Sequence, residues 1–492
     1  MSPDSSKDLL AYTPMLHSRL FTETQKFRDH HFQPIKAGLS SPTRSTETSA
    51  DVYLDGHPQF DRPLFVQFCA NSPDHLLEAA RYVEPYCDAV DLNLGCPQGI
   101  AKKGNYGAFL QEDWDLIYKL INELHTNLNV PVTAKMRILE SKEKTLEYAK
   151  MVLSAGASVI TVHGRQRDQK GHKTGLADWS VLRFLRQNLP PDTVIFANGN
   201  ILQHDDIWRC LEETGADGVM CAEGNLYDPT IFAKPPDIGH EGREYWRGRD
   251  GKGGYRMDAV FRRYMDIVYK YVLEQPPPAR KPLFLPSDPL SEDLPTHVNG
   301  SVNSNGDEPP AKRQKCHRSH IKPTSPNLLA MQPHLFHLLR ALVSTHTDIR
   351  DALARSRAGD ITSYENVLSM VEAAIKQGLL DYEINPAKYE DLEIPDEEEQ
   401  KASMDKDESS LAAVRRCRRP WWVCQSYVRP LPKEALEKGS LTISKKDRRK
   451  MEEESALGRA KNEQDKKSER EKLDEADGME RAEMPREAMV AG

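Results

Sequence analysis

Asp91-Leu92-Asn93-Leu94-Gly95-Cys96-Pro97 is the stretch of sequence from which the fold can be worked out. Residues 88–94 are mainly apolar and stop at Gly-Cys-Pro, which predicts a buried strand followed by a tight turn. A thiol just past the carboxyl end of a strand is where α/β barrels place their chemistry. The alternative is a buried structural cysteine, since free Cys is among the most buried residue types. Residues 101–108 add two lysines and two glycines, so we expect a mobile basic loop beside the thiol.

Strand-like and helix-like runs alternate around this stretch. The predicted strands are 9–15, 63–68, 89–94, 130–136, 158–163, 194–198 and 217–222, and helical patterns lie at 74–83, 113–124, 144–153 and 205–213. The β-α-β-α order predicts a parallel sheet, and the length of residues 8–235 suits a (β/α)₈ TIM barrel. An open doubly wound sheet is the alternative, but no Gly-x-Gly-x-x-Gly follows the first strand.

Seven strands are one fewer than a closed (β/α)₈ barrel requires. A barrel that lacks a strand has two bare edges, which proteins normally avoid. Either one strand escapes the pattern, or the first βα unit of the barrel is missing from this sequence; we expect the second.

Composition limits the class of protein. The net charge is −8, so any nucleic-acid surface has to be local, and the eight cysteines include no Cys-x-x-Cys pair. We expect no structural metal, no membrane span and no signal peptide. These features predict a soluble intracellular protein, cytoplasmic, nuclear or both, and we expect a monomer.

Composition changes after residue 235. Residues 255–390 carry amphipathic helical patterns at 256–273, 328–343, 348–356 and 364–377, interrupted by a Pro/Ser/Asn-rich stretch, 275–327, that we predict to be disordered. Residues 391–414 form an acidic linker, 415–432 are basic and aromatic, and 433–492 are charge-dense and predicted to be disordered. The pair Trp421-Trp422 after an arginine run suits stacking on RNA bases, or alternatively a segment that folds back with Trp in the core.

Polar residues end the later barrel strands. Lys135 interrupts an apolar run, and His163-Gly164-Arg165 closes the next strand. Residues 198–200 (Asn-Gly-Asn) and 222–225 (Ala-Glu-Gly-Asn) end the last two strands, where small residues let backbone N–H groups approach an anion. This pair of loops is a frequent phosphate site in α/β barrels, so the pattern predicts a phosphate-bearing cofactor across the barrel mouth.

These motifs together closely resemble the tRNA-dihydrouridine synthases. The resemblance is carried by DLNLGCP, the Lys103-Gly104-x-x-Gly107 loop, VTAKMR, TVHGRQRDQKG, FANGN and GVMCAEGNL over residues 10 to about 235. The segment beginning Pro420-Trp421-Trp422 and the Tyr12-Thr13-Pro14-Met15 run look like the eukaryotic branch acting at positions 16 and 17.

The resemblance implies a TIM barrel with FMN at its mouth, reduced by NAD(P)H, followed by a helical tRNA-binding domain. FMN would deliver a hydride to C6 of a tRNA uridine, and Cys96 would give a proton to C5. By position, the cofactor residues would be Gln67, Lys135, His163, Asn198, Gly199, Asn200, Ala222 and Glu223. Asn93, Lys102, Lys103 and Arg165 would face the tRNA.

The sequence also departs from the family pattern. The family's first strand carries an Ala-Pro-Met segment that contacts the flavin, and Thr13-Pro14-Met15 suits the second strand better. An alternative function is therefore a catalytically inactive tRNA-binding protein that does not hold FMN tightly. A second alternative is a flavin barrel acting on a small molecule, which the helical region and the basic-aromatic segment argue against.

Overall fold

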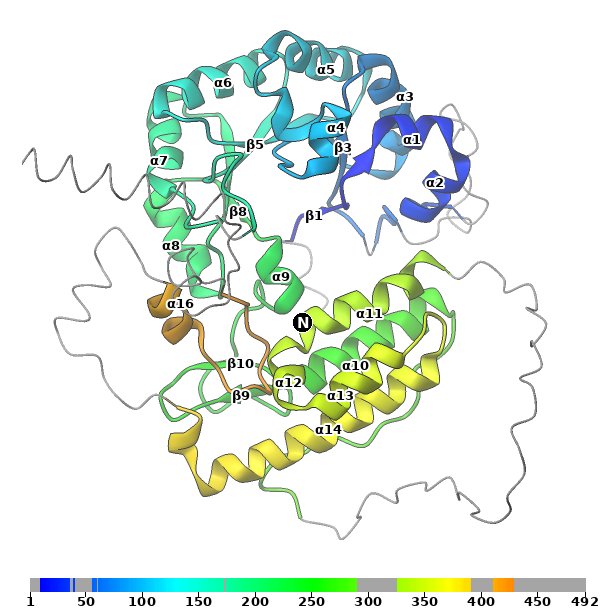
Figure 1. The fold of residues 1–492 in the computed structure, drawn as a ribbon, viewed down its shortest axis with the longest axis vertical. Coiled ribbons are helices and arrows are strands. Elements are labelled where there is room, and N and C mark those ends of the chain that lie inside the picture. The colour runs from blue at the N-terminus through cyan, green and yellow to red at the C-terminus, as the bar shows by residue number, and fades with distance from the viewer. Residues whose placement is uncertain are drawn as a thin grey trace, which may run out of the picture. The chain divides into compact units, whose positions relative to one another are not determined.

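The computed structural model of the chain describes residues 9–35, 39, 55–59, 61–171, 174–289, 325–390 and 410–428. Its main feature is a parallel sheet whose strands are joined by helices (Figure 1). The strands are β1 (Ala11–Tyr12), β2 (Leu16–His17), β3 (Leu64–Cys69), β4 (Ala89–Leu94), β5 (Val132–Arg137), β6 (Val159–His163), β7 (Val194–Asn198) and β8 (Gly218–Met220).

The order of the strands is that of a TIM barrel. β1 and β2 both pair with β3, and the sheet then runs β3-β4-β5-β6-β7-β8 in sequence order. The bounds predicted for β4 and β7 are confirmed. Of the predicted first strand, 9–15, only Ala11–Tyr12 forms a strand, and β2 begins just past its predicted end. Within the described residues no further strand pairs with the outer edges of β8 and of β1 and β2, so seven strand positions are filled.

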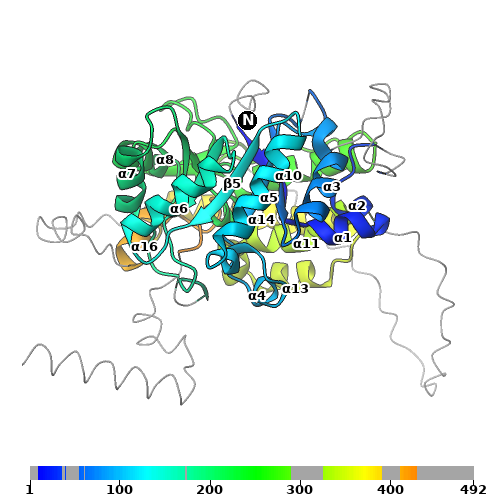
Figure 2. The same cartoon turned by 90° about the horizontal axis from the view of Figure 1, so that it is seen from above.

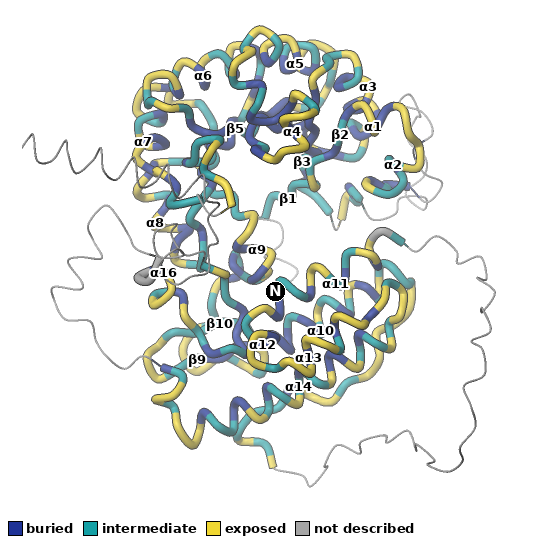
Figure 3. Tube along the Cα trace, in the orientation of Figure 1, coloured by how far each residue is buried: buried dark blue, intermediate teal, exposed yellow. Residues whose placement is uncertain are grey.

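Amphipathic helices cover the outer face of the sheet. They are α1 (Ser18–Glu23), α2 (Gln25–His31), α3 (Pro73–Val83), α5 (Trp114–Asn127), α6 (Lys142–Ser154), α7 (Trp179–Asn188) and α8 (Asp205–Thr214). Figures 1 and 2 show α3 and α5–α8 following one another around the sheet, and each packs on the next. Asp113 and Ser141 cap α5 and α6 by accepting hydrogen bonds from backbone N–H groups in the first turn. The core lies between the strands and these helices (Figure 3).

A second core belongs to the helical region. It consists of the β9 (Tyr245–Arg247) and β10 (Gly253–Tyr255) hairpin with α10 (Met257–Ile267), α11 (Pro326–Leu338), α12 (Arg340–Thr345), α13 (Thr347–Arg355) and α14 (Ile361–Ile384). Each helical pattern predicted in this part of the sequence is present. α14 continues to Ile384, past its predicted end at residue 377.

The basic-aromatic segment folds back into that second core. Trp422, which follows α16 (Ser410–Cys417), is 0 % exposed, and its carbonyl accepts a 2.8 Å hydrogen bond from the Met257 N–H. Gly378 of α14 makes room for the indole, because a Cβ there would lie 2.9 Å from the Trp422 ring. Of the two alternatives for the tryptophan pair, the core role therefore holds for Trp422.

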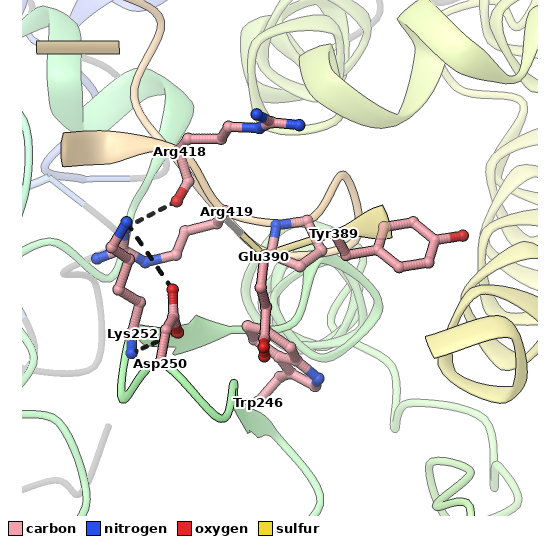
Figure 4. A pocket seen from close by; sticks show the side chains of 8 residues that line it. Trp246, Asp250, Lys252, Tyr389, Glu390, Arg418 and Arg419 are labelled. Atoms are coloured by element: carbon pink, nitrogen blue, oxygen red, sulfur yellow. Dashed lines mark hydrogen bonds and ion pairs between the residues drawn. The ribbon is translucent and has the colours of Figure 1, made fainter. Parts of the chain in front are cut away.

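The arginines of the segment also make contacts within the protein. Arg416 pairs with the buried Asp206 of α8 at 2.7 Å. Arg419 Nε donates to the Gly253 carbonyl at 3.1 Å. Figure 4 shows Arg418 and Arg419 lining a small hollow with Trp246 and Glu390. The segment therefore connects α8 to the hairpin through its charged groups.

Part of the predicted disordered insertion is described. Residues 275–289 have no regular secondary structure, but Arg280 pairs with Asp266 and with Glu365, the latter at 2.7 Å. Asp288 accepts two hydrogen bonds from Arg243. These ion pairs hold residues 275–289 against the helical region.

Several predictions fall outside the described residues. They concern residues 290–324 of the insertion, 391–409 of the acidic linker and the tail 433–492. In the part of the chain that is described, no helix combines the length and the apolar character needed to cross a bilayer.

We expect Trp422→Ala to lower the free energy of unfolding of the helical region by about 3–5 kcal/mol, because it empties a site in the second core. Denaturant unfolding followed by tryptophan fluorescence would measure this. Trp208→Ala is the matched control, since Trp208 is 64 % exposed, and it should change stability by no more than about 0.5 kcal/mol. Equal effects of the two substitutions would contradict the assignment of Trp422 to the core.

Candidate active site

Strand register gathers polar side chains inside the sheet. Gln67, Asp91 and Thr133 are neighbours across β3, β4 and β5. Two residues further along, Asn93 of β4 lies beside Lys135 of β5. Because alternate residues of a strand face the same side, both rows point away from the helices and into the interior of the curved sheet.

A chain of hydrogen bonds joins these residues. The fully buried Asp91 carboxylate accepts from Thr133 Oγ1 at 2.6 Å and from Gln67 Nε2 at 2.8 Å. Gln67 Oε1 in turn accepts from Asn93 Nδ2 at 2.7 Å. Burial raises the pKa of Asp91 to about 6, against the opposing effect of the two hydrogen bonds it accepts. Asp91 and Thr133 were not among the predicted site residues, although polar residues within an apolar run were the available signal.

The sheet curls far enough for its first strand to reach across the interior. The Tyr12 hydroxyl of β1 lies 3.4 Å from Thr161 Oγ1 of β6. Burial, followed by the charge of Asp91, raises the pKa of Tyr12 above its ordinary value. The neutral phenol therefore forms part of the same polar interior.

Asn93 also holds the turn that carries Cys96. Its Oδ1 accepts from the Gly95 N–H at 3.1 Å and from the Cys96 N–H at 2.9 Å. Gly107 packs on the other side, where a Cβ would lie 2.8 Å from the Cys96 carbonyl oxygen, and its φ is +64°. The Cys96 side chain is half-buried in this setting.

Two cations fix the same turn through its carbonyls. Arg137 Nε donates to the Gly95 carbonyl at 2.7 Å, and Lys170 Nζ donates to the Pro97 carbonyl at 2.6 Å. Neither residue was predicted to belong to the site. Arg137 lies on the same strand face as Lys135, which was the sequence signal for its position.

Lys135 is the cation at the centre of the mouth. Burial, with the neighbouring Arg137 charge, lowers its pKa to about 8. Within the described part of the chain its Nζ makes no hydrogen bond, although an ammonium group in a polar interior normally finds an acceptor. The amine is therefore available to an acceptor that the described residues do not supply.

His163 and Arg165 form a second group at the carboxyl end of β6. Arg165 donates to His163 Nε2 and to Asn200 Oδ1, each at 2.9 Å. Because a guanidinium only donates, Nε2 has to accept and the ring proton has to be on Nδ1. Burial, followed by the charges of Lys135 and Arg137, lowers the pKa of His163, so the ring is neutral. Arg165 thus lies next to the predicted cofactor residues, although it was predicted to face the tRNA.

The two predicted phosphate loops lie against each other. Asn198 Nδ2 donates to the Met220 carbonyl at 2.8 Å, and Cys221 Sγ lies 3.4 Å from the Ile201 carbonyl. Gly199 has φ +112°, and a Cβ there would lie 2.6 Å from the Ala177 Cβ.

These contacts restrict how the loops could bind an anion. Asn200 uses both ends of its amide on the backbone of Ala177. Because the side chains of Asn198 and Asn200 already bond within the protein, a phosphate would meet mainly backbone N–H groups. Ala222 and Glu223 are exposed at the start of α9 (Glu223–Tyr227), which follows β8.

The predicted mobile loop after Cys96 is largely helical. α4 spans Gly99–Gly104 and is followed by a C-cap residue, Asn105, whose φ is +49°. The Asn71 side chain donates to the Gly104 carbonyl at 2.8 Å. The prediction of a loop was wrong here because the buried Ala101 anchors one side of a short helix. Lys102 and Lys103 are exposed on α4.

The family model and three relatives that match this chain are named as dihydrouridine synthases or as like them. The family described as dihydrouridine synthase matches residues 2–247. The chain is 41 % identical over 424 residues to the tRNA-dihydrouridine(16/17) synthase [NAD(P)(+)] of Saccharomyces cerevisiae, covering 86 % of this chain and 78 % of that protein. It is 40 % identical to the protein of the same name from Schizosaccharomyces pombe, covering 86 % and 82 %. A Rattus norvegicus relative, named as like that synthase, is 33 % identical over 92 % of this chain and 76 % of its own length.

The lowered pKa of Lys135 predicts how the free energy of unfolding depends on pH. Its pKa falls from 10.5 when unfolded to about 8 when folded, so between these values the unfolded chain binds more protons and stability rises with pH. We expect the unfolding free energy of the wild type to increase relative to that of Lys135→Met as the pH rises across this interval. Denaturant unfolding at steps of pH would measure the difference. Parallel pH profiles of the two proteins would contradict the prediction.

Proposed function

Because the chain belongs to the dihydrouridine synthase family, we propose that it reduces uridine to 5,6-dihydrouridine in tRNA, at positions 16 and 17. The reductant is NAD(P)H, the cofactor is FMN and the partner is tRNA. The observation that carries this proposal is Cys96 itself, a half-buried thiol on a turn fixed by Asn93, Arg137 and Gly107. We further propose that the protein acts as a monomer in the cytoplasm, the nucleus or both.

The residues at the carboxyl end of the sheet fit FMN. Lys135 presents an ammonium group without an acceptor among the described residues, and His163 is neutral with its proton on Nδ1, so both can donate to a flavin ring. Gln67 Nε2 keeps a second N–H beyond the one given to Asp91. Gly199, Asn200, Ala222 and Glu223 would meet the phosphate end, with Asn198 holding the two loops together.

Bound FMN would supply the hydride that reaches C6 of the uracil. The part of the protein is then to deliver a proton to C5, from Cys96 Sγ. General acid assistance of this kind contributes roughly 10²–10⁴ in rate. Asn93, close to Cys96, would face the uracil.

Access to the uridine requires the base to leave its stack. This costs a few kcal/mol, and least in a loop such as the tRNA D-loop. Lys102 and Lys103 on α4, directly after the Cys96 turn, would contact the phosphates around the exposed base.

One observation favours the inactive tRNA-binding alternative. In the described part of the sheet, the edges of β8 and of β1 and β2 are not joined by another strand. The visible absorption spectrum of the purified full chain distinguishes the two functions. A flavin spectrum near one FMN per chain would support the enzyme, and a colourless protein that cannot be reconstituted with FMN would support the alternative.

We expect Cys96→Ala to lower dihydrouridine formation by about 10²-fold or more, since a general acid is lost. Its affinity for tRNA should stay close to that of the wild type. Dihydrouridine at positions 16 and 17 would be quantified by mass spectrometry of digested tRNA. Cys210→Ala, which changes a fully buried thiol on α8, is the matched control. Equal activity of Cys96→Ala and wild type would overturn the proton-donor role.

Replacing Lys102 and Lys103 together by Ala should weaken tRNA binding in a salt-dependent way. Removing two phosphate contacts should reduce the slope of log Kd against log salt by about 1–2. Filter binding at several salt concentrations would measure it. Lys119→Ala, at an exposed position on α5, should leave the slope unchanged, and an unchanged slope in the double variant would contradict the role of α4.

A further inference from the structure

The hydrogen bonds around Asp91 have a fixed direction. An ionised carboxylate only accepts, so Gln67 has to point its NH₂ group at Asp91. Gln67 Oε1 then faces Asn93, which has to present its own NH₂ group at 2.7 Å. This leaves Asn93 Oδ1 for the backbone N–H groups of Gly95 and Cys96.

The opposite direction fails at the far end of this relay, Asp91–Gln67–Asn93. If Gln67 turned over, its NH₂ group would face the NH₂ group of Asn93, and Asn93 would have to turn as well. The Asn93 NH₂ group would then meet the N–H groups of Gly95 and Cys96, and both hydrogen bonds to the turn would be lost. An acceptor at position 91 therefore favours the direction that holds Cys96, and a donor there would oppose it.

We propose that Asp91 is a positioning residue, whose carboxylate orients the Gln67 and Asn93 amides and through them holds the Cys96 turn. The inference rests on the proposed function only in giving Cys96 its chemical role. The geometric part concerns this chain alone. Asp91 lies two positions before Asn93 on β4, inside the sheet, and acts through the two amides.

The test measures how firmly Cys96 is held and does not depend on dihydrouridine formation. The purified full chain, without tRNA, is treated with iodoacetamide, and alkylation of the peptide containing Cys96 is followed by mass spectrometry. Asp91→Leu keeps a similar side-chain size but removes the acceptor. We expect it to accelerate Cys96 alkylation about threefold or more, because the turn opens more often. Thr133→Val removes the other donor to Asp91 while leaving the relay, and should stay within about twofold of the wild type.

Cys221 provides an internal standard in every variant. It is also half-buried, on the turn after β8, and its thiol contacts the Ile201 carbonyl rather than the relay. Its alkylation rate should not change in Asp91→Leu. Equal acceleration at Cys96 and Cys221 would indicate general loosening of the fold and would overturn the proposal.

A double-mutant cycle tests whether Asp91 acts through Asn93. Asn93→Ala cuts the relay at its last side chain, so it should accelerate Cys96 alkylation by itself. Adding Asp91→Leu to that background should then change the rate by less than about 1.5-fold, since coupled residues are not additive. Multiplication of the two separate effects would show that Asp91 acts independently, and the proposal would fail.

A transposed charge gives a second test if Asp91→Leu does not fold. In the double variant Gln67→Glu with Asp91→Asn, the carboxylate moves from position 91 to position 67. There it would accept from the amides at positions 91 and 93, so Asn93 would keep its native direction. We expect Cys96 alkylation within about twofold of the wild type, and acceleration like that of Asn93→Ala would overturn the proposal.

Discussion

Asp91 is an ionisable carboxylate placed where water does not reach it, and the residues around it follow from that constraint. A buried carboxylate has to be met by donors, because an unpaired charge in the interior is very costly. Thr133 and Gln67 supply them from the two neighbouring strands. The polar side chains inside this otherwise apolar sheet therefore provide hydrogen bonds to a single buried charge. Their chain of hydrogen bonds ends at the turn that carries Cys96.

The carboxyl end of the sheet gathers positive charge around that turn. Lys135, Arg137, Arg165 and Lys170 all lie there, and two of them are tied to turn carbonyls. Such a cluster favours anionic ligands, and burial together with the repulsion from Arg137 lowers the pKa of Lys135. The positive electrostatic potential at this end of the sheet and the conformation of the Cys96 turn thus depend on some of the same side chains.

The order of the sheet could be predicted from the sequence, because apolar runs of strand length recur between helical patterns. Lys135 and His163 could be singled out as polar residues within or at the end of strands, whereas Gln67 was expected only from the resemblance to the family. The partners of Asn198 and Asn200 could not be predicted, since Met220 and Ala177 lie on other segments of the chain. Trp422 was ambiguous for a different reason, because an indole suits both a core and a stacked base.

The late position of Trp422 in the chain also affects how the helical region folds during synthesis. The core of the helical region consists mostly of residues on α10 to α14, yet its fully buried indole is translated only after all of these helices. Chains generally fold from the amino end during synthesis. The apolar surface that Trp422 covers on these helices therefore stays exposed until residues 410–428 have left the ribosome. Chaperones that recognise exposed apolar surface would bind the chain chiefly during this interval.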